Sequence, residues 1–454
     1  MSERKSIHGE WSSGWAFFLA ATGAAVGLGN IWMFPYLAMR YGGGAFIVVY
    51  LICVALVAMP LLVTEITLGR RGRKSPANTF FELALDEGRS SVWAGAGFVA
   101  MAGGLIVAAF FSLVAAWSLE YLWRSLLSGY VGITSEQAGS ELQAMLGDPW
   151  LQMFWYSLFL AVAAGIVARG VRKGLDPAAR FMVPMLFALL LILIVYALWV
   201  GRPEPALRYL FVPDFSRLNA SGVLLALTYS FFGLSVGVGA MLNYGAYMPN
   251  HLPIMPMTAA VVFVDFLVAV SSGLAIYPLL IANGLPVSDG PTLVFTLLPA
   301  AFGSMPFGGF YAALFYLMLV LAAWTSVIAL LEPTVSWLVE CGWRRLWAAI
   351  LVAMIVWVIA MVLDFSFNLW SSITWHGRSV LDIFNAASSD IILPLSGFSA
   401  VFFAAWMMSE RSLRQELRTH RLLVRLWLIV LRYIAPVGIL FVLFNALGLM
   451  RGVL

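Results

Sequence analysis

The sequence predicts an all-α integral membrane protein with 11 transmembrane helices, arranged as two inverted repeats and one extra helix. Three observations predict this fold class. The chain is 62% hydrophobic and only 11% charged, whereas soluble domains contain about 25% charged residues. Its apolar residues form eleven runs that could each cross a bilayer, for which about 20 residues are needed. One glycine motif also occurs twice, in the first and the sixth run.

The eleven predicted spans follow one another through short connections. They cover approximately residues 12–38, 43–69, 92–128, 150–168, 177–200, 219–248, 254–283, 306–340, 346–364, 380–408 and 424–450. The net charge of +4 does not indicate nucleic-acid binding, because the basic residues lie in the loops between apolar runs. Cys53 and Cys341 imply no disulfide framework, and the first run has no cleavage site of a signal peptide.

The distribution of Lys and Arg predicts the orientation. With the N-terminal segment (1–11) inside, 18 of the 26 Lys and Arg residues lie on the inner side or at inner span ends. Seven, including Arg451, lie on the outer side. Because cytoplasmic loops carry the excess of these residues, we expect a cytoplasmic N-terminus. An odd number of spans then places the C-terminus outside.

The repeated motif is the most informative feature. GAAVGLG (23–29) recurs as GLSVGVG (233–239), and both read G-x-x-V-G-x-G. Five spans separate the copies, so they cross the membrane in opposite directions. This pattern predicts an inverted repeat with a broken helix in each half. The alternative, glycines that only allow close helix packing, does not explain why the motif occupies matching spans.

The repeat divides the chain. The first repeat is expected over 12–200 (spans 1–5) and the second over 201–408 (spans 6–10). A basic cytoplasmic loop and the last span then occupy 409–454.

A broken helix in a membrane is expected to bind ligands. Unwinding frees backbone groups, which is tolerated only where protein or a watery cavity satisfies them. Freed carbonyl groups can coordinate a cation, and the N-termini of half-helices can hold an anion. Two facing breaks therefore suit a zwitterion such as an amino acid, together with sodium ions.

Polar residues within the spans should gather around the breaks, because such residues are rare and usually functional. Asn30, Asp265, Thr325, Ser326 and Glu65 are the candidates. Their alternatives are structural. The Thr325 and Ser326 hydroxyl groups can bond to their own helix, Asp265 can form an ion pair, and Glu65 can cap free N–H groups of an unwound segment.

Four stretches resemble the neurotransmitter:sodium symporters, and in particular bacterial amino-acid members with eleven spans. They are GAAVGLGNIWMFPY (23–36), YGGGAF (41–46), FFGLSVGVGA (231–240) and AAWTSVIALLEP (322–333). The resemblance covers essentially the whole chain. It implies the LeuT fold, with broken helices 1 and 6, and a location in the bacterial inner membrane.

The resemblance also implies two sodium sites. One would use the carbonyl groups of Gly23, Val26 and Ala322 and the hydroxyl groups of Thr325 and Ser326. The second would use the Ala25 carbonyl, Asn30, Asp265 and the position of Gly233. This second site would lack one hydroxyl ligand, because relatives carry Ser or Thr where this chain has Gly233. Asp265 stands where many relatives have Asn, and its fixed charge resembles that of chloride-independent members.

The implied substrate pocket lies between the breaks. Its residues are Ala24, Gly27, Leu28, Gly29, Val107, Phe111, Phe232, Ser235, Val238, Ser326 and Leu330. Glycine at 27 leaves room for a carboxylate, whereas monoamine carriers have Asp there. The apolar side chains of Val107, Val238 and Leu330 suggest an apolar amino acid, although ordinary packing is the alternative for each.

The gates depart from the family pattern. Phe111 replaces a tyrosine whose hydroxyl meets the substrate carboxylate, and Met33 replaces the basic residue of the outer gate. Its acidic partner aligns with Asn385, with Asp382 as an alternative anchor.

On the inner side Trp11, Glu340 and Tyr247 match the family, and His8 replaces an arginine. A His–Glu pair there would respond to pH, because histidine changes charge in the physiological range.

The expected function is sodium-coupled symport of a small, apolar amino acid by alternating access, without chloride. The alternatives are a sensor or receptor on the same fold and a transporter of another small solute. An enzyme is not indicated, because no Ser–His, paired-Asp or His–Glu constellation lies inside the spans. We expect sodium ions, no organic cofactor, and a lipid bilayer and a small molecule as partners. The sequence does not indicate the oligomeric state.

Overall fold

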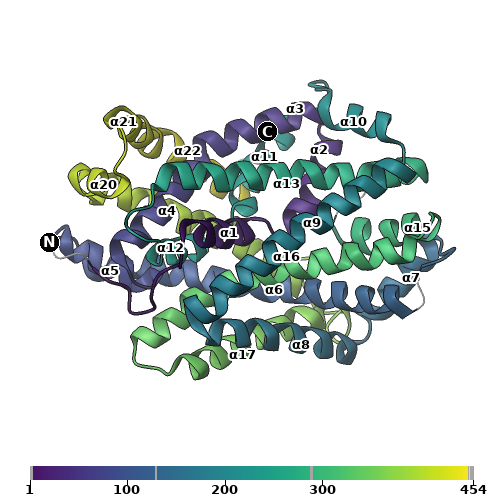
Figure 1. The fold of residues 1–454 in the computed structure, drawn as a ribbon, viewed down its shortest axis with the longest axis horizontal. Helices are drawn as coiled ribbons and strands as arrows, with labels where there is room; N and C mark the ends of the chain where they lie inside the picture. Colours follow the sequence, from purple (N-terminus) through teal and green to yellow (C-terminus); the bar gives the residue numbers. More distant parts are fainter. Residues whose placement is uncertain (1–3, 128–129, 287–289, 448, 450–454) are drawn as a thin grey trace.

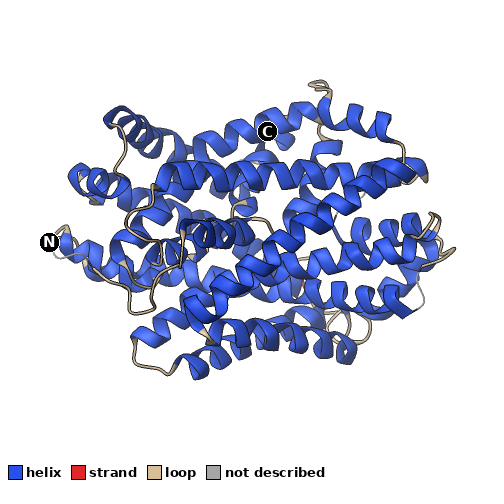
Figure 2. Cartoon of the chain, viewed as in Figure 1, coloured by secondary structure: helices blue, strands red, loops and turns tan. Residues whose placement is uncertain are grey.

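The computed structural model describes residues 4–127, 130–286, 290–447 and 449. The predicted span ends at 128 and 450, and Arg451, lie outside these residues. Most helices run along the long axis of the molecule, as Figure 1 shows. Figure 2 shows that helices dominate the structure. The two strands named in the described part, β1 (Thr374–Trp375) and β2 (Arg378–Ser379), form one antiparallel hairpin.

The helices have the following bounds, in which η marks short 3-10 or π-helical segments. In the first half they are α1 (Gly14–Ala25), α2 (Leu28–Arg40), α3 (Gly44–Cys53), η1 (Val54–Ala58), α4 (Met59–Gly72), α5 (Pro76–Asp86), η2 (Ser91–Trp93), α6 (Ala94–Leu127), α7 (Ser135–Leu146), α8 (Pro149–Ala168), η3 (Val171–Leu175), α9 (Asp176–Val200) and α10 (Pro203–Phe211). In the second half they are α11 (Ala220–Gly233), α12 (Ala240–Ala246), α13 (Ile254–Ala282), α14 (Gly290–Thr292), η4 (Leu293–Leu297), α15 (Leu298–Gly303), α16 (Gly308–Glu340), α17 (Arg345–Asp364), η5 (Phe365–Phe367), α18 (Val380–Asn385), η6 (Ala386–Ile392), α19 (Leu393–Phe402), η7 (Phe403–Met407), α20 (Glu410–Leu417), α21 (Arg421–Ile429), η8 (Val430–Ile434) and α22 (Ala435–Ala446).

Nine helical segments in the described residues are long and apolar enough to cross a membrane, and the bent pair α1–α2 makes ten. These ten follow the predicted spans closely. The sixth predicted span is instead two shorter helices, α11 and α12, because its middle is unwound. The all-α membrane fold is therefore confirmed, whereas the count of eleven spans stays a prediction.

The first break is short. Helix α1 begins at a Ser13 cap, whose side chain accepts a hydrogen bond from the Ala16 N–H, and it ends at Ala25. The backbone is extended at Gly27, and α2 leaves at an angle of 53° to α1.

The second break covers residues 234–239. Ser235, Gly237 and Gly239 have φ values of 51°, 81° and 75°. This left-handed region is one that glycine adopts without a steric penalty. Two of the repeated glycines therefore break the helix through their backbone freedom, which close packing alone would not require.

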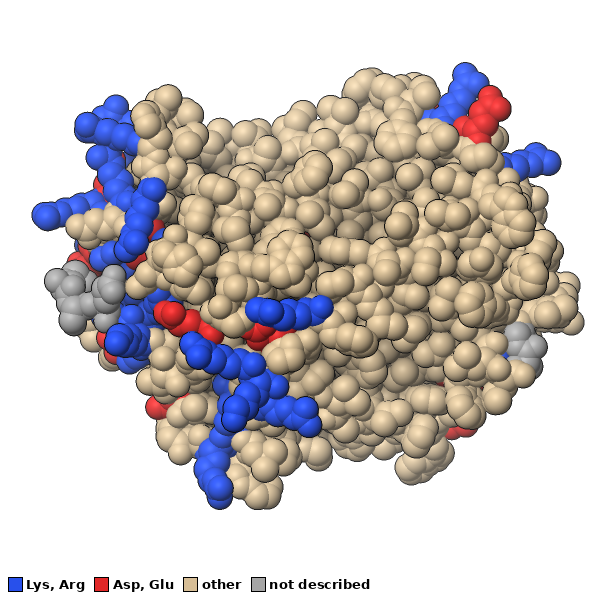
Figure 3. Space-filling view, in the orientation of Figure 1, with Lys and Arg blue, Asp and Glu red and all other residues tan. Residues whose placement is uncertain are grey.

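Charged side chains gather at one end of the molecule. Figure 3 shows Lys and Arg concentrated toward the left end, which in Figure 1 holds α20 and α21, and a broad surface without charged residues over the centre and right. We refer to this end as the basic end. The predicted inner loops are located there, and the connection α10 lies at the opposite end in Figure 1.

Candidate functional site

The first break leaves three carbonyl oxygens at the end of α1 without hydrogen-bond partners among the described residues. The Val26 N–H donates to the Thr22 carbonyl at 2.7 Å. Within the described chain, no hydrogen bond reaches the carbonyl oxygens of Gly23, Ala25 and Val26, and all three residues are buried. Buried carbonyl groups are nearly always paired with protein, water or ligand. These three oxygens can therefore serve as ligands of a cation.

Thr325 and Ser326 on α16 lie against this helix end. A Cβ on Gly23 would lie 3.2 Å from the Thr325 Cβ, and one on Gly27 would lie 3.3 Å from the Ser326 Oγ. The Thr325 hydroxyl donates to the Ala322 carbonyl at 2.9 Å. This is a bond to its own helix, which we considered above as the structural alternative for Thr325. That bond uses only the proton, and the oxygen keeps lone pairs for a cation. The Ser326 Oγ is buried and has no hydrogen-bond partner among the described residues.

Asn30 and Asp265 form a second buried polar pair. The Asn30 Nδ2 donates to the Asp265 Oδ1 at 2.7 Å, and both residues are at most 1% exposed. The Asp265 Oδ2 has no hydrogen-bond partner in the described part of the chain. The partner of this carboxylate is thus an amide from the first broken span, and not the Lys or Arg that a structural ion pair would need.

Tyr229 lies beside this pair, although the sequence analysis did not identify it as a candidate residue. Its hydroxyl donates to the Asn30 Oδ1 at 3.3 Å. A Cβ on Gly233 would lie 3.5 Å from the Tyr229 ring. The ring therefore lies beside the position where relatives carry a hydroxyl group. The available signal was spacing, since residues four apart on a helix lie on one face.

The two breaks contact each other directly. The Ser235 hydroxyl donates to the Ala24 carbonyl at 2.7 Å. At the start of α2, the N–H groups of Leu28 and Gly29 have no hydrogen-bond acceptor in the described structure. A helix N-terminus with free N–H groups attracts an anion. Gly27, which precedes them, has no side chain, and an ideal Cβ there would lie only 3.3 Å from the Ser326 Oγ and 3.6 Å from the Phe111 ring.

Gly104 on α6 was also missed by the sequence. A Cβ at this position would lie 3.0 Å from the Val238 carbonyl and 3.7 Å from the Leu330 carbonyl. Val107 lies one turn further along α6. Backbone groups of Val238 and Leu330 thus approach α6 at Gly104, one turn from Val107. The apolar subsite formed by the three side chains stays a prediction.

A cavity of about 390 Å³ leads from the opposite end toward this region. The predicted residues in its lining are Leu28, Gly29, Met33, Phe111, Phe232 and Asn385. The Phe111 and Phe232 rings meet edge to face with centroids 6.0 Å apart. The remaining predicted pocket residues are not in this lining. They are Ala24, Gly27, Val107, Ser235, Val238, Ser326 and Leu330. The aromatic pair therefore lines the cavity, and the Phe111 ring also lies beside Gly27, which is one of the residues outside the lining.

The two candidates for the acidic gate position differ in location. Asn385 shares the cavity with Met33, which is 37% exposed. Asp382 forms a capping box with Ser379 at the start of α18 and does not line the cavity. The structure therefore favours Asn385 over Asp382 as the residue that faces Met33.

The basic end of the core is closed by the N-terminal segment. The His8 Nε2 lies 3.1 Å from the Glu340 Oε1. Glu340 also accepts bonds from the Ser75 N–H at 2.7 Å and the Asn78 Nδ2 at 2.6 Å. The Trp11 side chain is 2% exposed. These three polar groups thus bond to the Glu340 carboxylate and tie this segment and α5 to the end of α16.

Tyr247 belongs to an adjacent network. Its hydroxyl donates to the Glu332 Oε1 at 2.7 Å, and the buried Glu332 pairs with Arg345. The Tyr247 and His8 rings lie 5.8 Å apart. From the sequence, Arg345 is only one of the basic residues predicted on the inner side. Nothing in the linear pattern links it to Glu332.

Glu65 holds the second break. Its Oε1 accepts a hydrogen bond from the Gly237 N–H at 2.7 Å. This contact has the geometry of the capping role that we considered for Glu65. The carboxylate is 2% exposed, so it satisfies a backbone group that water does not reach.

Comparisons with known proteins agree with this geometry. The family model described as the Sodium:neurotransmitter symporter family matches residues 8–131 and 141–452. The chain is 29% identical to the uncharacterised sodium-dependent transporter YhdH of Bacillus subtilis over 99% of this chain and 100% of that protein. It is 26% identical to an uncharacterised sodium-dependent transporter of Haemophilus influenzae over 96% of this chain and 98% of that one.

A solved structure shares the fold. The crystal structure of MhsT in complex with L-phenylalanine matches with a TM-score of 0.88 and 33% identity. The match covers 96% of this chain and 99% of MhsT. Together with the family match over nearly the whole length, this shows that the chain belongs to the sodium:neurotransmitter symporter family and is a sodium-dependent transporter with the LeuT fold.

Proposed function

We propose that this transporter is a symporter that couples sodium to the import of a small, apolar amino acid without chloride. The observation that carries the proposal is the set of oxygens at the first break. The carbonyl groups of Gly23 and Val26, at the end of α1, have no partner among the described residues. The Ala322 carbonyl and the hydroxyl groups of Thr325 and Ser326 are supplied by α16, which lies against this helix end. Sodium, as a hard cation, prefers carbonyl and hydroxyl oxygens.

Sodium at this position would join two helices that belong to different repeats. Helix α1 supplies backbone oxygens and α16 supplies side-chain oxygens, so an ion between them favours the arrangement in which the helices are close. This is how sodium binding can shift a conformational equilibrium, because an ion changes populations only through its different affinity for the two states. We propose this as the first sodium site.

A second ion would bind near Asp265. The free Asp265 Oδ2, the Asn30 Oδ1 and the Ala25 carbonyl supply oxygens there, whereas Gly233 supplies no side chain. The buried carboxylate provides the negative charge that a chloride ion would otherwise bring. This is the basis for proposing chloride independence.

The substrate would bind between the breaks. Its carboxylate would approach the free N–H groups of Leu28 and Gly29, because Phe111 lacks the hydroxyl group that relatives use. Its side chain would contact the apolar side chains of Val107, Val238 and Leu330. The phenylalanine bound in the related MhsT structure supports an apolar amino acid as the substrate class.

The cavity and the closed basic end suggest the direction of transport. Substrate would enter from the cavity past Met33 and leave when the His8–Glu340 contact opens. The excess of basic residues at this closed end supports a cytoplasmic N-terminus and a bacterial inner-membrane location. The proposed C-terminus is outside.

Uptake into proteoliposomes tests the proposal. A sodium gradient should drive accumulation of radiolabelled phenylalanine, leucine or alanine, with gluconate replacing chloride. Equal accumulation with a potassium gradient would contradict sodium coupling. Sodium-dependent binding without uptake would favour the sensor, and uptake of another solute alone would contradict the amino-acid assignment.

A further inference from the structure

The segment that contains α20 and α21, at the basic end, forms a cavity that has no role in the proposed transport cycle. It has a volume of about 700 Å³ and lies between α20, α21 and η8. Its charged lining is Glu410, Arg411, Arg414, Arg421, Arg425 and Arg432. Five arginines and a single carboxylate give this cavity a strong positive charge.

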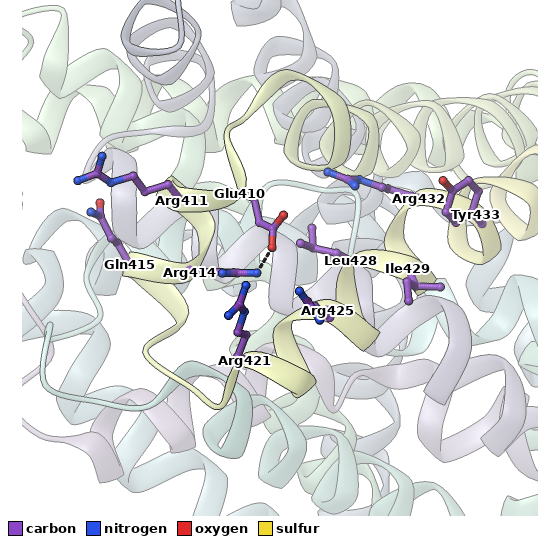
Figure 4. Close-up of a pocket in the computed structure, with 10 residues that line it drawn as sticks. All are labelled: Glu410, Arg411, Arg414, Gln415, Arg421, Arg425, Leu428, Ile429, Arg432 and Tyr433. Carbon is purple, nitrogen blue, oxygen red and sulfur yellow. Dashed lines mark hydrogen bonds and ion pairs between the residues drawn. The ribbon is translucent and has the colours of Figure 1, made fainter.

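The arginines are directed toward a common space. Figure 4 shows Arg414, Arg421 and Arg425 pointing toward one another beside Glu410. Arg414 pairs with Glu410. Arg421 and Arg425 make no side-chain hydrogen bond or ion pair with any described residue. Like charges held this close repel one another, so an anion among them would stabilise the arrangement.

One nitrogen in the cluster lacks a partner. The Nε of Arg414 is buried and donates to no described group. A guanidinium group has five N–H donors in a planar fork that matches a phosphate group. The cluster therefore has both the charge and the spare donors to bind phosphate oxygens.

Apolar side chains flank the arginines. On α21, Leu422, Leu426 and Ile429 are 58%, 51% and 52% exposed, and Tyr433 on η8 is 67% exposed. A helix that presents both exposed leucines and arginines is typical of the membrane interface. A free phosphate ion would use only the arginines, whereas a phospholipid would use both surfaces.

We propose that this cavity binds an anionic phospholipid, with the headgroup phosphate among Arg414, Arg421 and Arg425 and the acyl chains along α21. Basic pockets beside membrane helices are suited to such headgroups. The bound lipid would fix the α20–α21 loop against the last span. An acidic segment of another protein would not account for the exposed leucines.

The test compares lipids on the purified full-length protein in neutral detergent. Phosphatidylglycerol and phosphatidylcholine are titrated, and bound lipid is counted by native mass spectrometry while the thermal midpoint is recorded. We expect saturable binding of phosphatidylglycerol and much weaker binding of phosphatidylcholine. Equal binding of the two lipids would overturn the proposal, and so would inorganic phosphate producing the same saturable shift as phosphatidylglycerol.

The variant Arg421→Gln/Arg425→Gln localises the effect. A basic residue at a membrane surface contributes about 1 kcal/mol, so losing two should weaken phosphatidylglycerol binding about thirtyfold. The matched control is Arg172→Gln/Lys173→Gln, which removes two exposed charges from the η3 loop and should leave binding unchanged. Equal losses in both variants would refute the site. If the double variant does not fold, each single variant should bind phosphatidylglycerol about fivefold more weakly. A single variant with unchanged binding would also refute the proposed site.

Discussion

The Ser326 hydroxyl allows a sharp test of the proposed sodium site. Its oxygen is buried and has no hydrogen-bond partner among the described residues. An unsatisfied buried polar group costs about 1–3 kcal/mol. Replacing Ser326 by alanine removes this cost, so without sodium we expect the variant to be more stable than the wild type by about 1 kcal/mol.

With sodium present, the difference in stability between the variant and the wild type should change. Ser326→Ala removes one of five proposed oxygen ligands, for which we expect an affinity about tenfold weaker, or ~1.4 kcal/mol. At a sodium concentration 100 times its dissociation constant, the wild type gains about 2.7 kcal/mol. At the same concentration the variant would gain only about 1.4 kcal/mol. The stability advantage of the variant should therefore shrink or disappear as sodium is added.

Thermal unfolding in detergent measures both effects. Sodium chloride is titrated against choline chloride at constant ionic strength. The matched control is Ser118→Ala on α6, because the buried Ser118 hydroxyl donates to the Val114 carbonyl at 2.9 Å. The control should lose about 1 kcal/mol at every sodium concentration. The reasoning fails if Ser326→Ala behaves like this control, or if it keeps the full stabilisation by sodium.

Three further predictions concern the charge, the gate and the subsite. Asp265→Asn should slow uptake and make it respond to chloride, which replacement of chloride by gluconate would reveal; wild-type rates in both salts would exclude the proposed role. Glu340→Gln removes the charged acceptor of His8, and because such bonds are worth about 1.5–3 kcal/mol we expect efflux from loaded liposomes to rise about tenfold or more. Unchanged efflux would show that other contacts close the basic end. Gly104→Ala narrows the apolar subsite by one methyl group, so competition uptake should shift toward alanine over phenylalanine by about 10-fold or more; an unchanged preference would place the subsite elsewhere.

Much of the fold was predictable because each signal is local. Apolar runs identify the spans, and the repeated glycines identify the two breaks. The extent of the breaks was not predictable. The copies share one motif, yet the first break involves Val26 and Gly27, and the second unwinds residues 234–239. The longer break depends on Glu65, which is 172 positions from Gly237 in sequence and bonds to its N–H.

The residues of the candidate site could be predicted only where they belong to a recognisable sequence motif. Backbone ligands follow from the glycine motif, and the hydroxyl pair follows from its position in span 8. Tyr229 and Gly104 could not be found in this way, because their roles come from neighbours on other helices. Asp382 illustrates the converse. The spacing of Ser379 and Asp382 is that of a capping box. This local pattern predicts a capping role for Asp382 and not a role in the outer gate.

The two breaks share a sequence motif but differ in how their backbone groups are satisfied. At the second break, Glu65 accepts from the Gly237 N–H, and the Ser235 hydroxyl reaches the Ala24 carbonyl. The protein itself therefore satisfies the Gly237 N–H of the second break and the Ala24 carbonyl of α1. At the first break, the carbonyl oxygens of Gly23 and Val26 find no such partner in the described chain. Because buried carbonyl groups without partners are costly, a cation bound to Gly23 and Val26 stabilises the first break. The Thr325 and Ser326 hydroxyl groups lie beside this break, so sodium should act mainly by fixing α1 against α16.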